Sequence, residues 1–262
     1  MFTNNQTGYY GVREDILPMT NASKRLPIVF CLDVSPSMGW KEGNNSSSIE
    51  LLNAAVTNFV QELKKDAKAR TAAEIAFVTF STNIEMDSEF ESISSMKTPT
   101  FKPVRRGGTQ MAAAVLRSIE KIEERRRQLE NSEIGYYAPF MVLVTDGNPD
   151  KNDDPAKYNR ALALVKSHCD SHIGASEIIV PFIIGVGDNI DAETLNNYSA
   201  GFTKGYFPIK GNAHYAQIEF NKVFKMIGNS TKKSIHLNRS GREIVQTIQT
   251  DMNELLEDLA GI

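Results

Sequence analysis

Short apolar runs that alternate with helix-like segments constrain the fold of this chain most strongly. Each run is rich in β-branched and aromatic residues, a composition typical of a strand buried on both faces of a sheet. The runs cover residues 26–32 (LPIVFCL), 74–81 (EIAFVTFS), 139–147 (PFMVLVTDG) and 177–187 (EIIVPFIIGVG). Strands that alternate with helices predict an α/β fold, with a Rossmann-like, doubly wound, mostly parallel central sheet covered by helices on both faces.

The segments between and after these runs complete the predicted architecture. Residues 84–93 are charged and alternating, which predicts one short antiparallel edge strand or hairpin. Residues 205–210 contain Pro208, so they are expected to form an edge strand. Residues 49–65 and 110–130 carry helical apolar stripes, and we expect the charged second half of 110–130 to face solvent.

The chain is predicted to form one domain with an extension at each end. Residues 1–25 are polar without a clear period and are interpreted as an N-terminal arm, extended or strapped over the domain. Residues 26–228 form the sheet domain, and residues 229–262 form a C-terminal helical extension. Its helix at 242–260 has one apolar stripe, and it either folds back on its own domain or binds another protein.

Composition narrows the possible classes of function. A net charge of -3 and a pI near 5.9 argue against broad nucleic-acid binding, which needs a basic face. The two cysteines, Cys31 and Cys169, have no partners at zinc-site spacing and suggest no disulfide framework. No stretch has the ~20 apolar residues of a membrane span, and the start does not resemble a secretory signal. We therefore expect a cytoplasmic protein without membrane contacts.

Carboxylates and hydroxyls follow the predicted strands at one end of the sheet. Asp33, Ser35 and Ser37 come after the first run, Asp146 ends the third, and Thr109 follows two glycines at the start of a helix. The carboxyl ends of parallel strands share one sheet edge, so these side chains can converge. An oxygen-only ligand set suits Mg²⁺, with Mn²⁺ or Ca²⁺ as alternatives. The competing interpretation is that Asp and Ser only cap the next helix.

The motifs D-V-S-P-S (33–37), G-G-T (107–109) and V-T-D-G (144–147) resemble those of the von Willebrand factor A (VWA) family. The resemblance spans about residues 26–228 and implies a metal-ion-dependent adhesion site. It implies that the serines and the threonine bind Mg²⁺ directly, and that the two aspartates bind directly or through water. The ligands would be Ser35, Ser37, Thr109, Asp33 and Asp146.

A narrower resemblance is carried by RLPIVFCLDVSPSMGW, PVRRGGTQMAAAV and LVTDGNPD. These segments look like the tellurium-resistance-associated bacterial VWA proteins. That subgroup implies an intracellular scaffold in a stress or signalling system, with a protein kinase and a PP2C-type phosphatase as partners.

Two classes of function stay open at this point. The first is a non-enzymatic interaction module whose metal accepts an Asp or Glu from a protein partner. Trp40, Arg105 and Arg106, with Lys102 nearby, would then contact the partner. The second is a metal-dependent phosphoryl-transfer hydrolase of Rossmann-like fold. A haloacid-dehalogenase phosphatase needs a second acid two residues after its aspartate, where this chain has Ser35.

Overall fold

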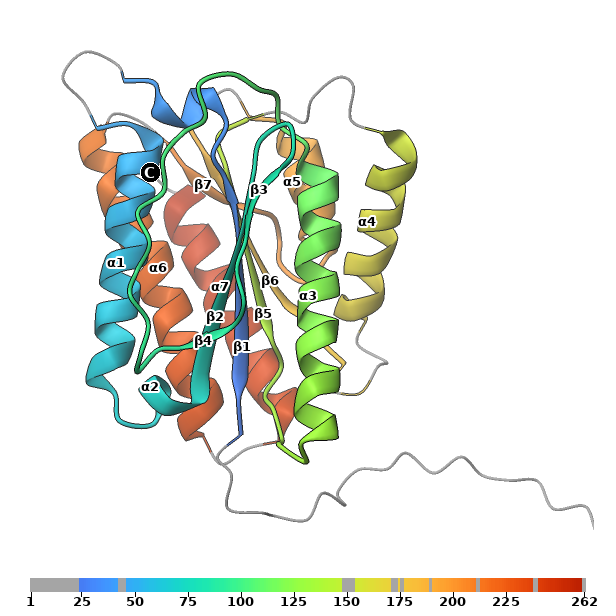
Figure 1. Ribbon diagram of the computed structural model, residues 1–262. Helices are drawn as coiled ribbons and strands as arrows, with labels where there is room; N and C mark the ends of the chain where they lie inside the picture. Colours follow the sequence, from blue (N-terminus) through green and yellow to red (C-terminus); the bar gives the residue numbers. More distant parts are fainter. Residues whose placement is uncertain are drawn as a thin grey trace, which may run out of the picture.

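The apolar runs assemble into one central sheet in the computed structural model (Figure 1), which describes residues 24–41, 46–147, 154–170, 174, 177–188, 190–210, 213–237 and 240–260. The described strands are β1 (Leu26–Asp33), β2 (Ala73–Phe80), β3 (Ile84–Asp87), β4 (Glu91–Ser92), β5 (Phe140–Thr145), β6 (Val180–Val186) and β7 (Phe207–Ile209). Their order is β3-β2-β1-β5-β6-β7, with β4 also paired to β2. Only β3 and β4 run antiparallel to their neighbour. The predicted fold class is confirmed, and all but the last two residues of the predicted arm lie outside the described residues.

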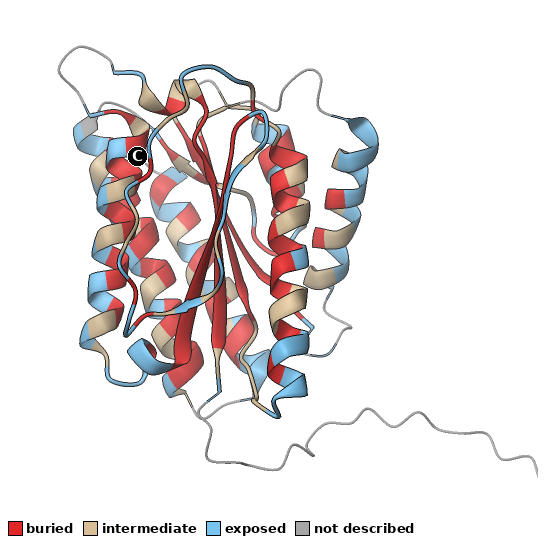
Figure 2. Cartoon of the chain, viewed as in Figure 1, coloured by how far each residue is buried: buried red, intermediate tan, exposed pale blue. Residues whose placement is uncertain are grey.

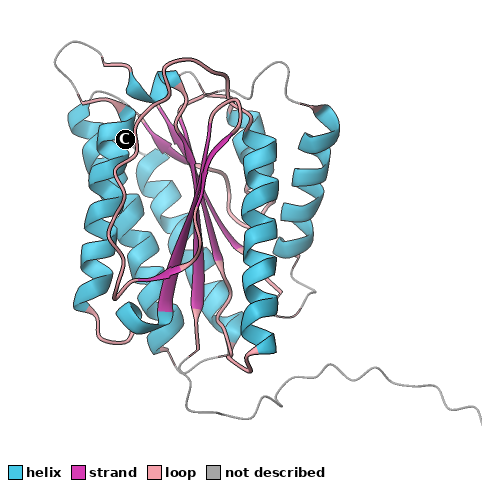
Figure 3. Cartoon of the chain, in the orientation of Figure 1, coloured by secondary structure: helices cyan, strands magenta, loops and turns pink. Residues whose placement is uncertain are grey.

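Helices cover both faces of the sheet (Figure 3). They are α1 (Ser48–Lys65), α2 (Ala69–Ala72), α3 (Met111–Asn131), α4 (Pro155–Cys169), α5 (Ala192–Tyr198), α6 (Ala213–His236) and α7 (Gly241–Ala260), with a 3-10 turn η1 (Pro36–Gly39). One apolar cluster joins the sheet to α1, α2, α6 and α7, and a second joins it to α3, α4 and α5. No helix in the described part of the chain is long and apolar enough to cross a membrane.

The alternation of side chains along β1 explains why the strand is apolar throughout. Ile28 and Phe30 pack in the first cluster, and Val29 and Cys31 pack in the second. A strand with helices on both sides has no solvent-facing row, so every residue of β1 is buried (Figure 2).

The exposed edge of β7 has its backbone donors occupied. The Tyr206 N–H donates to Asn196 Oδ1 at 3.3 Å, and the Lys210 N–H donates to Glu219 Oε2 at 2.6 Å. Pro208, between them, has no N–H. The edge position predicted from this proline is confirmed, and the edge offers few free donors to another strand.

The C-terminal helix packs on its own domain. α7 lies beside α6 and β7 (Figure 1), and its buried residues belong to the first apolar cluster. Two ion pairs join it to α6: Lys222–Asp258 at 2.7 Å and Lys233–Asp251 at 2.5 Å. α6 itself continues unbroken through Gly228, where the sequence analysis places a domain boundary.

The charged second half of α3 is partly buried, so the expectation that it faces solvent is wrong at Lys121 and Arg126. The Lys121 ammonium lies 2.7 Å from Asp87 Oδ1, on β3. The Arg126 guanidinium donates to Glu123 at 2.5 Å and to the carbonyl of Ile178 at 2.9 Å. Burial of these charges is tolerated because each has an oxygen partner.

We expect Arg125→Met to lower the free energy of unfolding by about 2 kcal/mol, because it breaks a charged hydrogen-bonded pair and leaves a buried carboxylate unpaired. The guanidinium of Arg125 donates to both oxygens of Glu74, at 2.6 and 2.7 Å, and Glu74 is buried. Urea unfolding measures the effect. Arg127→Met is the matched control, because Arg127 is exposed on the same helix. An equal loss of unfolding free energy in the two variants would contradict a stabilising role for the Arg125–Glu74 pair.

Candidate metal centre

Three loops bring the predicted site residues together at the carboxyl edge of the sheet. Asp33 is the last residue of β1, and Asp146 directly follows the neighbouring strand β5. Ser37 lies in η1, and Thr109 lies two residues before α3. β1 and β5 are the strands at which the strand order reverses, the position where open α/β sheets bind ligands.

Hydrogen bonds connect the two aspartates through the two serines. The Ser35 N–H donates to Asp33 Oδ1 at 2.7 Å. The Ser35 and Ser37 hydroxyl oxygens lie 3.0 Å apart, and the Ser37 hydroxyl donates to Asp146 Oδ1 at 2.9 Å. Two predicted carboxylates and two predicted hydroxyls therefore share one continuous network.

Thr109 lies close to this network, on the loop that precedes α3. A methyl group placed on Gly147 would lie 3.2 Å from Thr109 Oγ1 and 3.6 Å from Asp33 Oδ2. The absence of a side chain at Gly147 thus lets the threonine hydroxyl and the Asp33 carboxylate approach the same space. The structure brings all five predicted ligand residues to one edge of the sheet.

The Gly-Gly-Thr turn is held by the loop after β2. The Gly108 N–H donates to Thr82 Oγ1 at 2.6 Å, and the Gln110 N–H donates to the carbonyl of Ser81 at 2.7 Å. A side chain at Gly107 would lie only 2.9 Å from Thr82 Oγ1. Glycine is therefore required for the loop to come this close.

The two carboxyl groups lie in a partly dry site, where a negative charge is costly unless a positive charge is near. Asp33 is fully buried, and burial raises its pKa. Burial and then the negative charge of Asp33 raise the pKa of Asp146 to about 7. In the described part of the chain, neither carboxylate forms an ion pair with Lys, Arg or His. A bound cation would supply the missing positive charge.

The donor set fits a hard cation. Its atoms are carboxylate and hydroxyl oxygens, which Mg²⁺ and Ca²⁺ prefer. Among the described residues, no group of three or more His, Cys, Asp or Glu side chains is arranged to hold a metal. Zinc and copper sites typically use imidazole or thiolate ligands, and this donor set contains neither.

Sequence reasoning missed Thr145 as a site residue. Its hydroxyl donates to Asp33 Oδ2 at 2.6 Å, and both residues are buried. The parallel register pairs Leu32 with Val144, which places Asp33 beside Thr145 at the ends of the two strands. The sequence does show a hydroxyl residue, Thr145, directly before Asp146. Only the register between β1 and β5 shows that its hydroxyl donates to Asp33.

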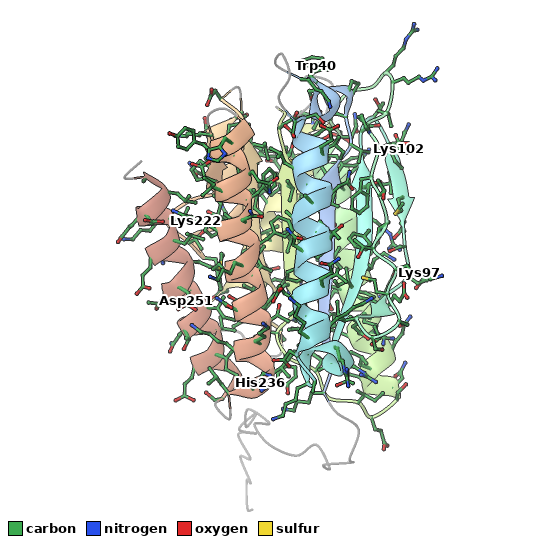
Figure 4. All side chains as sticks on the ribbon, turned by 90° about the vertical axis from the view of Figure 1, so that its left-hand side faces the viewer. Trp40, Lys97, Lys102, Lys222, His236 and Asp251 are labelled. Atoms are coloured by element: carbon green, nitrogen blue, oxygen red, sulfur yellow. The ribbon has the colours of Figure 1, made fainter. Side chains whose placement is uncertain are left out.

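The residues predicted to contact a partner are exposed. Trp40 is 73% exposed and lies at the same end of the molecule as the site (Figure 4), so it does not pack over its own loop. Lys102, Arg105 and Arg106 are also exposed. These positions allow partner contacts, and the contacts themselves stay a prediction.

The fold and the site define an α/β domain with an oxygen-lined cluster at the carboxyl edge of a parallel sheet. The family model of the von Willebrand factor type A domain matches residues 28–218. The chain therefore belongs to the von Willebrand factor type A family. No curated protein sequence matches the chain.

Solved structures share the fold at low sequence identity. The PilB minor pilin from Streptococcus sanguinis has a TM-score of 0.54 and 13% identity over 81% of this chain and 63% of the pilin chain. The pilus adhesin SpaC from Lactobacillus rhamnosus GG has a TM-score of 0.52 and 14% identity over 78% of this chain and 31% of its own. This chain thus spans less than two thirds of either protein, and the likeness concerns the fold alone.

Proposed function

We propose that this protein is a non-enzymatic interaction module that binds a divalent cation, Mg²⁺ first, at the site formed by Asp33, Ser35, Ser37, Thr109 and Asp146. Through that cation it engages an acidic residue of a protein partner. The observation that carries the proposal is the hydrogen-bonded network that joins both aspartates through Ser35 and Ser37 at the edge of the sheet.

Coordination and charge explain how such a site would select an acidic partner. Ser35, Ser37 and Thr109 offer three neutral oxygens, and the aspartates offer charge directly or through water. Mg²⁺ takes six oxygens, so a bound ion keeps a position open for a partner's carboxylate. Burial of the ligands strengthens the attraction between the bound cation and the partner's carboxylate, because the local dielectric constant is lower than that of water.

The surroundings of the site support a protein partner. Trp40 is an exposed aromatic side chain, and Arg105 and Arg106 are exposed cations able to attract an acidic surface. By resemblance to the tellurium-resistance-associated proteins, we propose a cytoplasmic scaffold role in a bacterial stress or signalling system. The proposed partner is a protein kinase or a PP2C-type phosphatase. We do not propose binding to nucleic acid or to a membrane.

The alternative, a metal-dependent phosphoryl-transfer hydrolase, needs a general base beside the metal. Within the described residues, the network around Asp33 and Asp146 contains hydroxyls and backbone groups and no further acid or histidine. Asp33 and Asp146 are themselves assigned as ligands. The donor set therefore favours binding over catalysis.

Capture of a candidate kinase or PP2C-type phosphatase by the tagged full chain tests the proposal. We expect binding in Mg²⁺, loss in EDTA, recovery when Mg²⁺ is restored, and at least tenfold weaker binding by Thr109→Ala. Thr100→Ala, at an exposed threonine, is the matched control. The proposal would be rejected if partner binding were unchanged both in EDTA and in the Thr109→Ala variant. Turnover of phosphate esters or nucleotides that depends on Mg²⁺ or Mn²⁺ and on Asp33 would support the hydrolase instead.

A further inference from the structure

The end of β2 holds the start of the loop that carries the serines of the candidate site. Phe80 is the last residue of β2, and it pairs with Asp33 in the parallel register of β1 and β2. The Val34 N–H, one residue after Asp33, donates to the carbonyl of Phe80 at 2.8 Å. This side of the site is therefore anchored by a backbone bond between neighbouring strands.

The loop that carries Thr109 is anchored differently, by the turn between β2 and β3, which lies beside the start of α3 (Figure 1). The Gly108 N–H donates to Thr82 Oγ1 at 2.6 Å. The Gln110 N–H donates to the carbonyl of Ser81 at 2.7 Å. Both neighbours of Thr109 are thus bonded to this turn. The first of the two bonds uses a side chain, so a substitution can remove it without altering the backbone.

The turn between β2 and β3 is closed by bonds of its own. The Ser81 N–H donates to the carbonyl of Asn83 at 2.9 Å, and the Ser81 hydroxyl donates to Glu85 on β3. Thr82 lies between these residues and directly against Gly107, where a methyl group would come within 2.9 Å of Thr82 Oγ1. The Thr82 side chain therefore stands on a closed turn and fixes how near the Gly-Gly-Thr backbone comes.

The place of the Thr109 hydroxyl determines how well the site fits a small cation. Thr109 Oγ1 and Asp33 Oδ2 approach the same space beside Gly147. Mg²⁺ demands near-ideal octahedral geometry at about 2.0–2.1 Å, whereas Ca²⁺ accepts more oxygens at about 2.3–2.6 Å in flexible arrangements. A displacement of the Thr109 oxygen should therefore weaken the binding of Mg²⁺ more than the binding of Ca²⁺.

We propose that Thr82 is a positioning residue of the metal site, which favours Mg²⁺ over Ca²⁺ by holding Thr109 in place through the Gly108 N–H. This inference rests on the proposed function, because it requires a cation at the site. Thr82 acts through Thr109 and is not itself assigned as a ligand. Its bond to Gly108 is exposed, so water can accept the freed N–H and the fold survives when the bond is lost.

Titration of the full chain with Mn²⁺, followed by competition with Mg²⁺ and with Ca²⁺, tests the proposal. Thr82→Val keeps the shape of the side chain and removes its hydroxyl. We expect its affinity for Mg²⁺ to fall at least about fivefold, and its affinity for Ca²⁺ to fall less than about twofold. Thr82→Ser retains the hydroxyl and should restore the preference for Mg²⁺. A general loosening of the fold would lower both affinities together.

Thr100→Val is the matched control, because Thr100 is also an exposed threonine, and it should change neither affinity. A thermal melt in EDTA checks that each variant is folded, and Thr82→Ala should behave as Thr82→Val does. Wild-type affinity for Mg²⁺ in Thr82→Val, or an equal loss of affinity for both cations, would overturn this inference and leave the proposed function standing. If the wild type showed no saturable Mn²⁺ binding, the proposed metal site would itself be rejected, and this inference with it.

Discussion

Deletion of residues 238–262 is expected to lower the melting temperature by at least about 15 °C or to leave a protein that aggregates. This segment contains α7, whose side chains close the first apolar cluster. The buried ones are Ile244, Val245, Ile248, Met252, Leu256 and Leu259. Truncating one such side chain typically costs about 2–5 kcal/mol, and a whole domain is stable by only about 5–15 kcal/mol.

A matched pair of point variants separates a structural role from a partner role for α7. Ile248→Ala should cost about 3 kcal/mol, because Ile248 is fully buried. Thr250→Ala, at an exposed position of the same helix, should change little. Calorimetry or urea unfolding measures both. A deletion that leaves the melting temperature unchanged but abolishes a complex would show that α7 serves a partner instead.

Asp33→Asn is expected to weaken Mg²⁺ binding at least a hundredfold while the fold is retained. The amide keeps an oxygen that accepts the Ser35 N–H, and its NH₂ group donates to Thr145, whose hydroxyl then acts as acceptor. What is lost is the negative charge that attracts the cation. Burial raises the pKa of Asp33 and makes its charged form costly, so replacement by a neutral amide should leave the metal-free protein as stable as the wild type, or more so.

Isothermal titration with Mg²⁺ and a thermal melt in EDTA check the two halves of this prediction. Asp154→Asn is the control, because Asp154 caps α4 at an exposed position. An Asp33→Asn variant that binds Mg²⁺ within about threefold of the wild type would mean that Asp33 acts only as a cap for its loop.

The sheet could be predicted from sequence because burial on both faces leaves a continuous apolar run. β1, β2, β5 and β6 are buried throughout, and each has such a run. The burial of the second half of α3 could not be predicted from sequence. Its charged side chains could equally face solvent or be buried in ion pairs within the chain. Only the tertiary structure places Asp87 beside Lys121.

The candidate site was predictable for a topological reason, since residues that follow parallel strands must meet at one edge. Asp33 and Asp146 do so although they are far apart in the sequence. Thr109 follows no parallel strand and reaches the same edge because its turn is bonded to Ser81 and Thr82. The contact from Thr145 to Asp33 was not predictable, because it depends on the register between β1 and β5.

Titration of the full chain with Mn²⁺, with the free ion followed by electron paramagnetic resonance, tests the central claim most directly. The account predicts one saturable site for which Mg²⁺ competes, with affinity at least tenfold lower in Thr109→Ala and unchanged in Thr100→Ala. The absence of saturable binding, or binding of equal affinity in wild type and Thr109→Ala, would contradict it.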